Sequence, residues 1–532
     1  MRKESHSMLW EEEAARTNRG CSSFLSLQTL YKYLSLSNFM ITLPCVLQFP
    51  LMTLRYGGAT FIIVYTILLL ILIFPTALLQ LLFSRMSQTN PVSIWAKFVP
   101  ISAGIGPGLV TTSILCSSVT LVDTAQSLIY MWSSFRNDVP PADTYIMNHH
   151  HEQFKRSPFF MKMNPMHQRM NLSLSEEAPM LSDDKDSLLL VETLIAGAFL
   201  LILTLLLKTS RLRYLQCILQ AIVIILMVAM LIQSASSSTF SMFSTALSPD
   251  WSKMWESSTW VSAAMLAVVS TNLHSGVIMT SNRESSSEYT GVALGLASIT
   301  HLVFCVLMTH VLYFFTSVKP GNINSRESVM MMIKHTVSSG NAWHQINLVT
   351  IFLLGVASIL SKLMVPLTYI EDKTFRAAWL KKFGLILSMV TMSLLPYFPE
   401  TRNIMTHLET WGVEISSMIV TSMTLMAIVW CYGVTRMVQK LAPKNGGYSS
   451  PIRITILQLM GNIGLVLLSS FAGLAIFTRA QESCLIGPVI AILVMAIVIL
   501  SSIIGVCILG RRERTKTLSW KDYFMEIAGR RS

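Results

Sequence analysis

The sequence predicts an all-α integral membrane protein whose chain crosses the bilayer twelve times. Charged residues make up only 13% of the 532 residues, while 52% are hydrophobic. Soluble domains average about 25% charged residues, so the low charge content is the sharper signal. Apolar runs long enough to span a membrane recur along the chain. They are rich in Leu, Ile, Val, Met and Ala and lack the period-2 alternation of a membrane β-barrel.

The apolar runs divide the chain into spans joined by polar connections. We expect the spans at residues 37–56, 59–84, 105–134, 189–207, 213–234, 258–281, 290–317, 346–370, 380–397, 412–439, 452–478 and 485–510. Residues 1–36 then form an N-terminal segment, 37–510 the twelve-span domain and 511–532 a basic tail. An even number of spans places both ends of the chain on one side of the membrane.

The net charge of +12 follows the topology of the spans. Basic residues collect in alternate connections, as at 208–213, 373–382 and 436–444, and in the C-terminal tail. This positive-inside pattern predicts a multi-pass membrane protein with both termini in the cytoplasm. We expect it in the plasma membrane. Orientation in the lipid bilayer therefore explains the excess of basic residues. We expect no nucleic-acid partner. The first twenty residues lack an apolar stretch beside their charges, so no cleaved signal peptide is expected.

Two long polar connections, 135–188 and 318–345, are expected outside the cell. The first holds Asn171-Leu172-Ser173, a glycosylation acceptor that works only on that side. It also holds His149–His151 and several methionines, which could bind copper or zinc. A flexible polar loop explains the same residues, and we expect no metal site. The eight cysteines show no paired spacing and are expected to be reduced structural thiols.

Spans 1 and 6 are expected to be broken helices. Span 1 contains Pro44 and Pro50, and proline removes a helical hydrogen bond. Span 6 contains the polar stretch 270–276. Broken helices at matching positions of two five-helix halves mark the central site of many transporters. Alternatively, proline only kinks a continuous helix in span 1, and the polar stretch of span 6 forms a contact between helices.

Two ionisable residues, Lys362 and Asp123, lie deep within spans, where a buried charge normally faces a cavity or a partner. Ser358 lies four residues before Lys362 and therefore shares its helical face. Lys362 could instead extend to a membrane surface, and Asp123 could serve a structural ion pair. Three histidines within spans are expected to be hydrogen-bonded core residues rather than proton relays: His274, His301 and His310.

An ordered set of motifs resembles the neurotransmitter:sodium symporters, the family of the bacterial leucine transporter. The resemblance covers roughly residues 25–510. The motifs are 427–436 (AIVWCYGVTR, similar to AxxWxYGxxR), 48–50 with 56–61 (QFP and YGGATF, similar to RFP and NGGGAF), 354–358 (LGVAS, similar to LGLDS) and Gly276-Val277. Each motif is weak alone, and their order along the chain makes the resemblance specific.

The resemblance implies two inverted five-helix repeats plus two extra helices, with a substrate site between spans 1, 3, 6 and 8. An amino acid or amine is the implied substrate, with sodium and chloride as co-transported ions and no other cofactor. The matching substrate positions are Thr42, Val119, Thr120, His274, Ser275, Ser358 and Lys362. The matching ion-site positions are Ile41, Cys45, Ala297, Ala357 and Ser358, and the outer gate falls at Gln48 and Glu409.

Several of these positions depart from the family pattern. Cys45 and Ala297 stand where the first sodium site has two Asn residues, and a thiol and a methyl group cannot replace amide oxygens around a hard cation. Ala357 replaces an Asp or Thr beside Ser358, and Gln48 replaces the gate Arg. These substitutions argue against full sodium coupling.

Lys362 suggests a replacement for the missing ion, because its ammonium could stand in for the sodium charge. No Asp lies near Thr42, where amine carriers of the family have one, so a monoamine substrate is disfavoured. The sequence therefore predicts a secondary active transporter of an amino acid or related small zwitterion or amine, working by alternating access. The alternative is a transport-inactive relative that acts as a membrane sensor, chaperone or scaffold. No HExxH, GxSxG or P-loop motif suggests an enzyme.

Overall fold

The computed structural model describes ten stretches of the chain, and all regular secondary structure within them is helical. The stretches are residues 27–87, 89–135, 182–235, 247–284, 290–316, 342–373, 378–395, 407–441, 451–480 and 486–513. The glycosylation acceptor Asn171, the loop histidines and the end of the basic tail lie outside them. The expected all-α fold class is confirmed for the part of the chain that is described.

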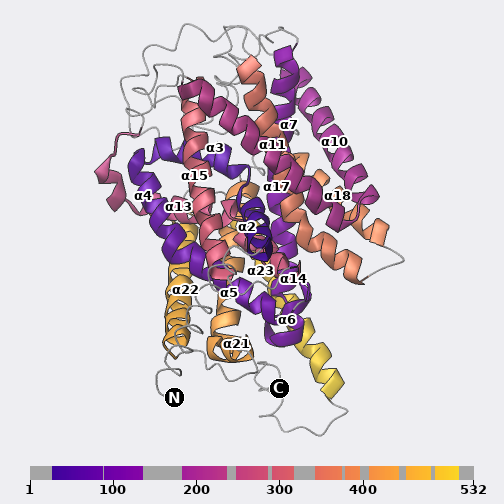
Figure 1. Cartoon of the computed structure of the whole chain (residues 1–532). Helices are drawn as coiled ribbons and strands as arrows, with labels where there is room; N and C mark the ends of the chain where they lie inside the picture. Colours follow the sequence, from indigo (N-terminus) through magenta and orange to yellow (C-terminus); the bar gives the residue numbers. More distant parts are fainter. Residues whose placement is uncertain are drawn as a thin grey trace, which may run out of the picture.

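Helices occupy the positions of all the predicted spans (Figure 1). Their bounds are α2 Leu27–Met40, α3 Pro44–Arg55, α4 Ala59–Leu68, α5 Phe74–Ser87, α6 Ser93–Phe98, α7 Ile105–Phe135, α10 Ser182–Leu206, α11 Thr209–Ala235, α13 Ser257–Ser270, α14 Val277–Glu284, α15 Thr290–Thr316, α17 Ala342–Lys373, α18 Ala378–Ser393, α20 Ser416–Met426, α21 Val434–Leu441, α22 Pro451–Ala480 and α23 Ile486–Glu513. The π-helical turns η1 Leu69–Ile73, η7 Leu408–Ile415 and η8 Ala427–Gly433 join or extend neighbouring helices, and the short 3₁₀ turns are η2 Pro100–Ser102, η4 Trp251–Trp255 and η5 Leu273–Ser275.

The expected count of twelve spans is only partly visible among the described residues. Seven helical stretches are long and apolar enough to cross a membrane, and an eighth is added if the bent pair α2–α3 is one span. Three further apolar helices are shorter: Thr193–Leu206, Ser257–Ser270 and Pro488–Ile504.

Span 1 begins at α2, about ten residues before the predicted start at residue 37. The polar residues of α2 lower its hydropathy, which hides the start of the span in the sequence. Lys32 is one of them, and it is fully buried in the structure. Its ammonium donates to Thr290 Oγ1 at 3.0 Å, so the charge contacts a polar group on α15.

Both predicted helix breaks are present. The axes of α2 and α3 meet at 59°, and Pro44 is the first residue of α3, where its missing N–H costs no helical bond. Pro50 lies within α3 without ending it. The second break separates α13 from α14, and Asn272 and Gly276 adopt left-handed backbone there, with φ of 53° and 69°.

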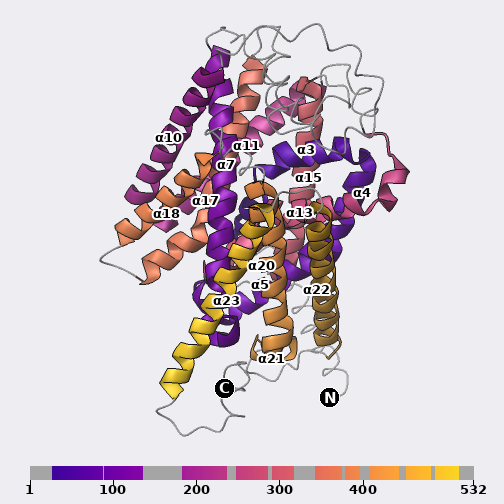
Figure 2. The same ribbon diagram turned by 180° about the vertical axis from the view of Figure 1, so that it is seen from behind.

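The long helices α7 and α17 pack side by side through the centre of the bundle (Figure 1). Small residues allow this close approach, because a Cβ atom added at Gly355 would lie 2.3 Å from Thr124 Oγ1. From behind, α23 crosses α7 and covers the same helix (Figure 2). A Cβ atom at Gly104 would lie 1.8 Å from the Val498 carbonyl oxygen, so this contact also requires glycine. The closely packed helices α7 and α17 also contact the elements beside the breaks, α7 at η5 and α17 at α2 and α14.

Candidate functional site

The first helix break exposes backbone carbonyls that have no partner within a regular helix. In this chain, side chains from three other elements bond to them. The pairs are Asn272 Nδ2 to the Phe39 carbonyl (2.9 Å), His301 Nδ1 to the Met40 carbonyl (2.8 Å) and Gln220 Nε2 to the Ile41 carbonyl (2.7 Å). The break is therefore held by the protein's own donors.

The second break is bonded to the first. The hydroxyl of Thr42 donates to the Ser270 carbonyl at 2.7 Å, and Asn272 Nδ2 also reaches Ser361 Oγ on α17 at 3.0 Å. Asn272 adopts positive φ, which Asn tolerates better than most residues. The left-handed residue thus links α2, α17 and its own break through one amide group.

A small cavity of about 20 Å³ lies between α3, α7, α13, α17 and η7. Its polar lining is formed by Gln48, Thr120, Asp123, Lys362 and Glu409. A cavity needs roughly 10–15 Å³ to hold one water molecule. This cavity therefore has room for water and is too small for an amino acid in the conformation described.

Lys362 is fully buried and reaches this cavity from α17. Its ammonium donates to Thr120 Oγ1 on α7 at 2.5 Å. Among the described residues, this is its one hydrogen bond, and no ion pair involves it. One turn earlier on α17, Ser358 Oγ accepts a 2.7 Å bond from the backbone N–H of Leu43. Lys362 therefore does not extend to a membrane surface, which excludes that alternative.

The two expected gate residues contact each other within the cavity lining. Gln48 Nε2 on α3 donates to Glu409 Oε1 at 3.3 Å. The amide thus makes a hydrogen bond where an arginine would make an ion pair. The structure thus places in contact the two residues that the resemblance assigns to an outer gate, and their role as a gate stays a prediction.

The structure gathers only part of the expected substrate set around the cavity. Val119 and Thr120 line it with Lys362, whereas His274 and Ser275 are buried in the second break. His274 Nδ1 lies 3.5 Å from the Val268 carbonyl, and its Nε2 has no partner among the described residues. The cavity also contains Asp123, which the sequence marks as a buried charge without assigning it to the site.

The ion-site positions offer few oxygen ligands. Cys45, Ala297 and Ala357 are buried, and none has a side-chain oxygen. The carbonyl of Ile41 accepts from Gln220, and the hydroxyl of Ser358 accepts from backbone. Hard cations are held by several oxygens, so the side chains at these positions do not suit sodium.

The sequence reasoning noted His301 and the stretch that contains Asn272, but it missed Gln220 and did not connect the three donors with the first break. Each is a polar residue within an apolar span, which is the signal that could have singled them out. Their targets could not be foreseen, because each bond joins residues at least 179 positions apart.

A family model described as the sodium:neurotransmitter symporter family matches residues 28–517. The chain belongs to this family. The resemblance expected from the motifs is thereby confirmed, and this family member is a multi-pass membrane protein of a transporter family rather than an enzyme.

Curated relatives match a limited part of this family member. The human sodium- and chloride-dependent neutral and basic amino acid transporter B(0+) is 33% identical over 107 residues, which is 20% of this chain and 16% of that protein. The human inactive sodium-dependent neutral amino acid transporter B(0)AT3 is 31% identical over 107 residues, 20% of this chain and 17% of that protein. The matched segments thus span less than a fifth of these relatives.

A solved structure supports the fold over a longer range. The crystal structure of MhsT in complex with L-phenylalanine aligns with a TM-score of 0.62 and 15% identity, covering 84% of this chain and 99% of MhsT. At that identity the likeness concerns the fold alone. This symporter-family chain therefore shares the helical architecture of MhsT.

Proposed function

We propose that this chain is a secondary transporter that moves an amino acid or a related small zwitterion or amine across the plasma membrane by alternating access. Both termini lie in the cytoplasm, and the substrate binds at the cavity between α3, α7, α13 and α17. The Lys362 ammonium supplies there the positive charge that co-transported sodium would otherwise contribute.

The burial of Lys362 is the observation that carries this proposal. A charged group within the membrane costs several kcal/mol unless a partner or water compensates it. Lys362 makes a single hydrogen bond among the described residues, and the adjoining cavity has room for water only. An incoming carboxylate would give the ammonium a partner once the cavity enlarges. Such a gain of charge pairing favours substrates that carry a carboxylate.

Two further observations favour transport without full sodium coupling. The carbonyls of the first break already accept hydrogen bonds from Asn272, His301 and Gln220. The side chains of Cys45 and Ala297 provide no oxygen at the expected first ion site. A sodium ion would have to displace these donors and would find few ligands to replace them.

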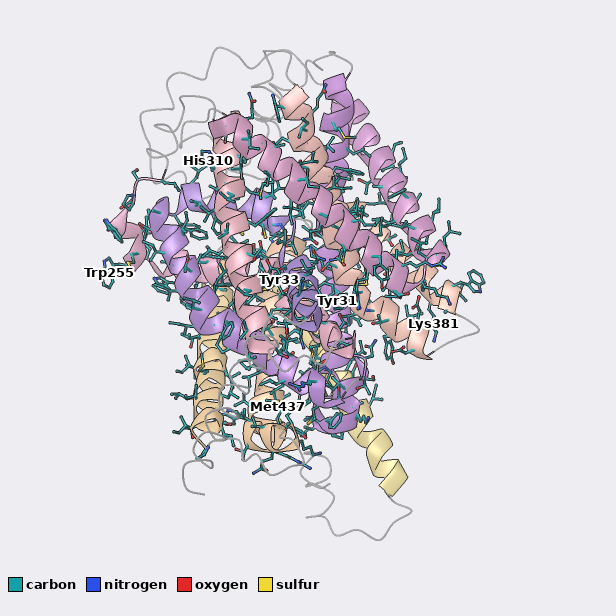
Figure 3. The ribbon with its side chains drawn as sticks, viewed as in Figure 1. Tyr31, Tyr33, Trp255, His310, Lys381 and Met437 are labelled. Atoms are coloured by element: carbon teal, nitrogen blue, oxygen red, sulfur yellow. The ribbon has the colours of Figure 1, made fainter. Side chains whose placement is uncertain are left out.

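Uptake measurements test the proposal. Radiolabelled amino acids are supplied to oocytes that express the chain, with sodium or with choline as the cation and at two pH values. Uptake of at least one amino acid is expected to continue in choline, and Lys362→Met is expected to reduce it at least about tenfold, as loss of a charge-assisted contact predicts. Lys381→Met is the matched control, because Lys381 is an exposed lysine at the edge of the bundle (Figure 3). Surface biotinylation corrects for differences in expression. Wild-type uptake that stops without sodium would contradict the role of Lys362.

A transport-inactive membrane protein is the second candidate. It is favoured by the water-sized cavity and by the similarity to a relative whose name describes it as inactive. In that case the chain reaches the cell surface and yet neither uptake nor substrate-dependent current is seen for any amino acid or amine, with or without sodium. Such a result would favour a sensor, chaperone or scaffold and would contradict the transport proposal.

A further inference from the structure

Two thiols and an imidazole meet beside the first helix break. Cys45 lies in the first turn of α3, while His301 and Cys305 lie one turn apart on the same face of α15. One ligand atom from each residue lies within 4.8 Å of the other two, and all three side chains are fully buried. The sulfur of Cys45 is 3.8 Å from His301 Nδ1, and the sulfur of Cys305 is 3.8 Å from His301 Nε2.

The sulfur of Cys305 and Nε2 of His301 are about as far apart as two ligands that share one metal ion. The sulfur of Cys45 lies near Nδ1 and would have to turn toward Nε2. Zinc binds sulfur at about 2.3 Å and imidazole nitrogen at about 2.0–2.1 Å, which puts tetrahedral ligand atoms roughly 3.3–3.8 Å apart. Rotation of the two cysteine side chains would supply the remaining movement. Soft ligands of this kind select zinc(II) or copper(I) and disfavour sodium, calcium and magnesium.

The hydrogen bonds of His301 prepare it to bind through one nitrogen. Nδ1 lies 2.8 Å from the Met40 carbonyl, and a carbonyl can only accept, so Nδ1 carries the proton. Nε2 therefore has the free lone pair, and the hydroxyl of Tyr65 donates to it at 2.7 Å. Histidines that bind metals commonly fix their second ring nitrogen on a backbone carbonyl in this way. A metal at Nε2 would replace the Tyr65 proton and leave the phenol oxygen close to the ion.

The charge balance suits a site inside the membrane. Binding of zinc(II) releases the thiol protons of Cys45 and Cys305, and two thiolates neutralise the ion. Binding of copper(I) is neutral when one thiol proton is released and the second thiol remains protonated. In either case no net charge is buried, which avoids the main cost of placing an ion in this environment.

We propose that Cys45, His301 and Cys305 form a binding site for one thiophilic metal ion, zinc(II) or copper(I). The ion would join the start of α3 to the middle of α15, next to the break that separates α3 from α2. The proposal concerns metal binding by the folded chain and does not depend on transport activity.

Metal analysis of the purified full-length protein tests the site. The chain is expressed with added zinc or with added copper, purified in detergent, and analysed by mass spectrometry for both metals. We expect about one zinc or one copper per wild-type chain, because thiolate and imidazole ligands bind both ions tightly. Either metal supports the proposal, and the two growth conditions distinguish them. Cys45→Ser and Cys305→Ser should each lower the metal content at least about fivefold, since each removes one of the three ligands. Cys431→Ser is the control, because Cys431 is a cysteine that lies outside the cluster.

Three results would overturn the proposal. The first is a wild-type protein that holds neither metal after both preparations and after incubation with each ion, a result that does not depend on how the variants fold. The second is equal metal content in the wild type and in the Cys45→Ser/Cys305→Ser double variant, which would assign binding to other residues. The third is a disulfide between Cys45 and Cys305, detected by peptide mass mapping of the untreated protein.

Discussion

Replacement of Thr120 by Val removes the hydroxyl to which the Lys362 ammonium donates, with little change in side-chain shape. Hydrogen bonds that involve a charged group contribute about 1.5–3 kcal/mol, and their loss is most costly where the charge stays buried. Thr120→Val should therefore lower the free energy of unfolding by about 1.5–3 kcal/mol, a factor of roughly 10–150 in the unfolding equilibrium. Thr120→Ser keeps the hydroxyl and is the matched control.

The assay is a double-mutant cycle, measured as reversible unfolding in mixed detergent micelles. In the Lys362→Met background the ammonium is absent, so Thr120→Val should cost less than about 1 kcal/mol, the range of a neutral hydrogen bond. The remaining cost is the bond from Thr120 Oγ1 to the Cys116 carbonyl, which both backgrounds share. An equal cost of Thr120→Val in the two backgrounds would show that the contact with Lys362 contributes nothing, and the reasoning would fail.

Three other substitutions test the packing, the gate and the second break. Gly355→Ala should destabilise the protein by about 1–3 kcal/mol, as overpacking does, and Thr124→Ala should recover part of that loss; equal unfolding midpoints for Gly355→Ala and wild type would contradict the close approach of α7 and α17. Gln48→Glu should destabilise the protein more than Gln48→Met, because it sets a second carboxylate against Glu409. Thermal unfolding compares the two variants, and a lower unfolding temperature for Gln48→Met would refute the prediction. Asn272→Ala should be less stable than Asn272→Gly by about 1–2 kcal/mol. Both variants lose the same hydrogen bonds, so the difference is the cost of placing alanine in left-handed backbone. The same unfolding assay compares them, and equal stability would contradict this cost.

The sequence alone was sufficient for the fold class and the two breaks, and the family resemblance pointed to the pair Gln48 and Glu409. Apolar run length and the polar stretch of span 6 are local properties, so they can be read without knowing how the helices pack. The start of span 1 was placed too late, because Lys32 lowers the hydropathy of α2 and finds its partner only in the folded chain. Helix length and composition identify seven or eight spans among the described residues, because three further apolar helices are shorter.

The residues that surround the site were harder to predict. The hydrogen bond between Lys362 and Thr120 joins positions 242 residues apart, and no spacing rule relates them. Cys45 and Cys305 likewise look like scattered structural thiols in the sequence. Only the packing of α3 against α15 brings them to one histidine.

The hydrogen bonds at the first break have a consequence for conformational control. A solute changes a conformational equilibrium only if it binds one state better than the other. The break carbonyls are satisfied by Gln220, Asn272 and His301, which are covalently part of the chain and present at a fixed effective concentration. In the proposed transport cycle, these internal bonds would help to set the balance between open and closed states, and their strength would not depend directly on the salt outside the cell. Evolution could tune that balance one amide or imidazole at a time.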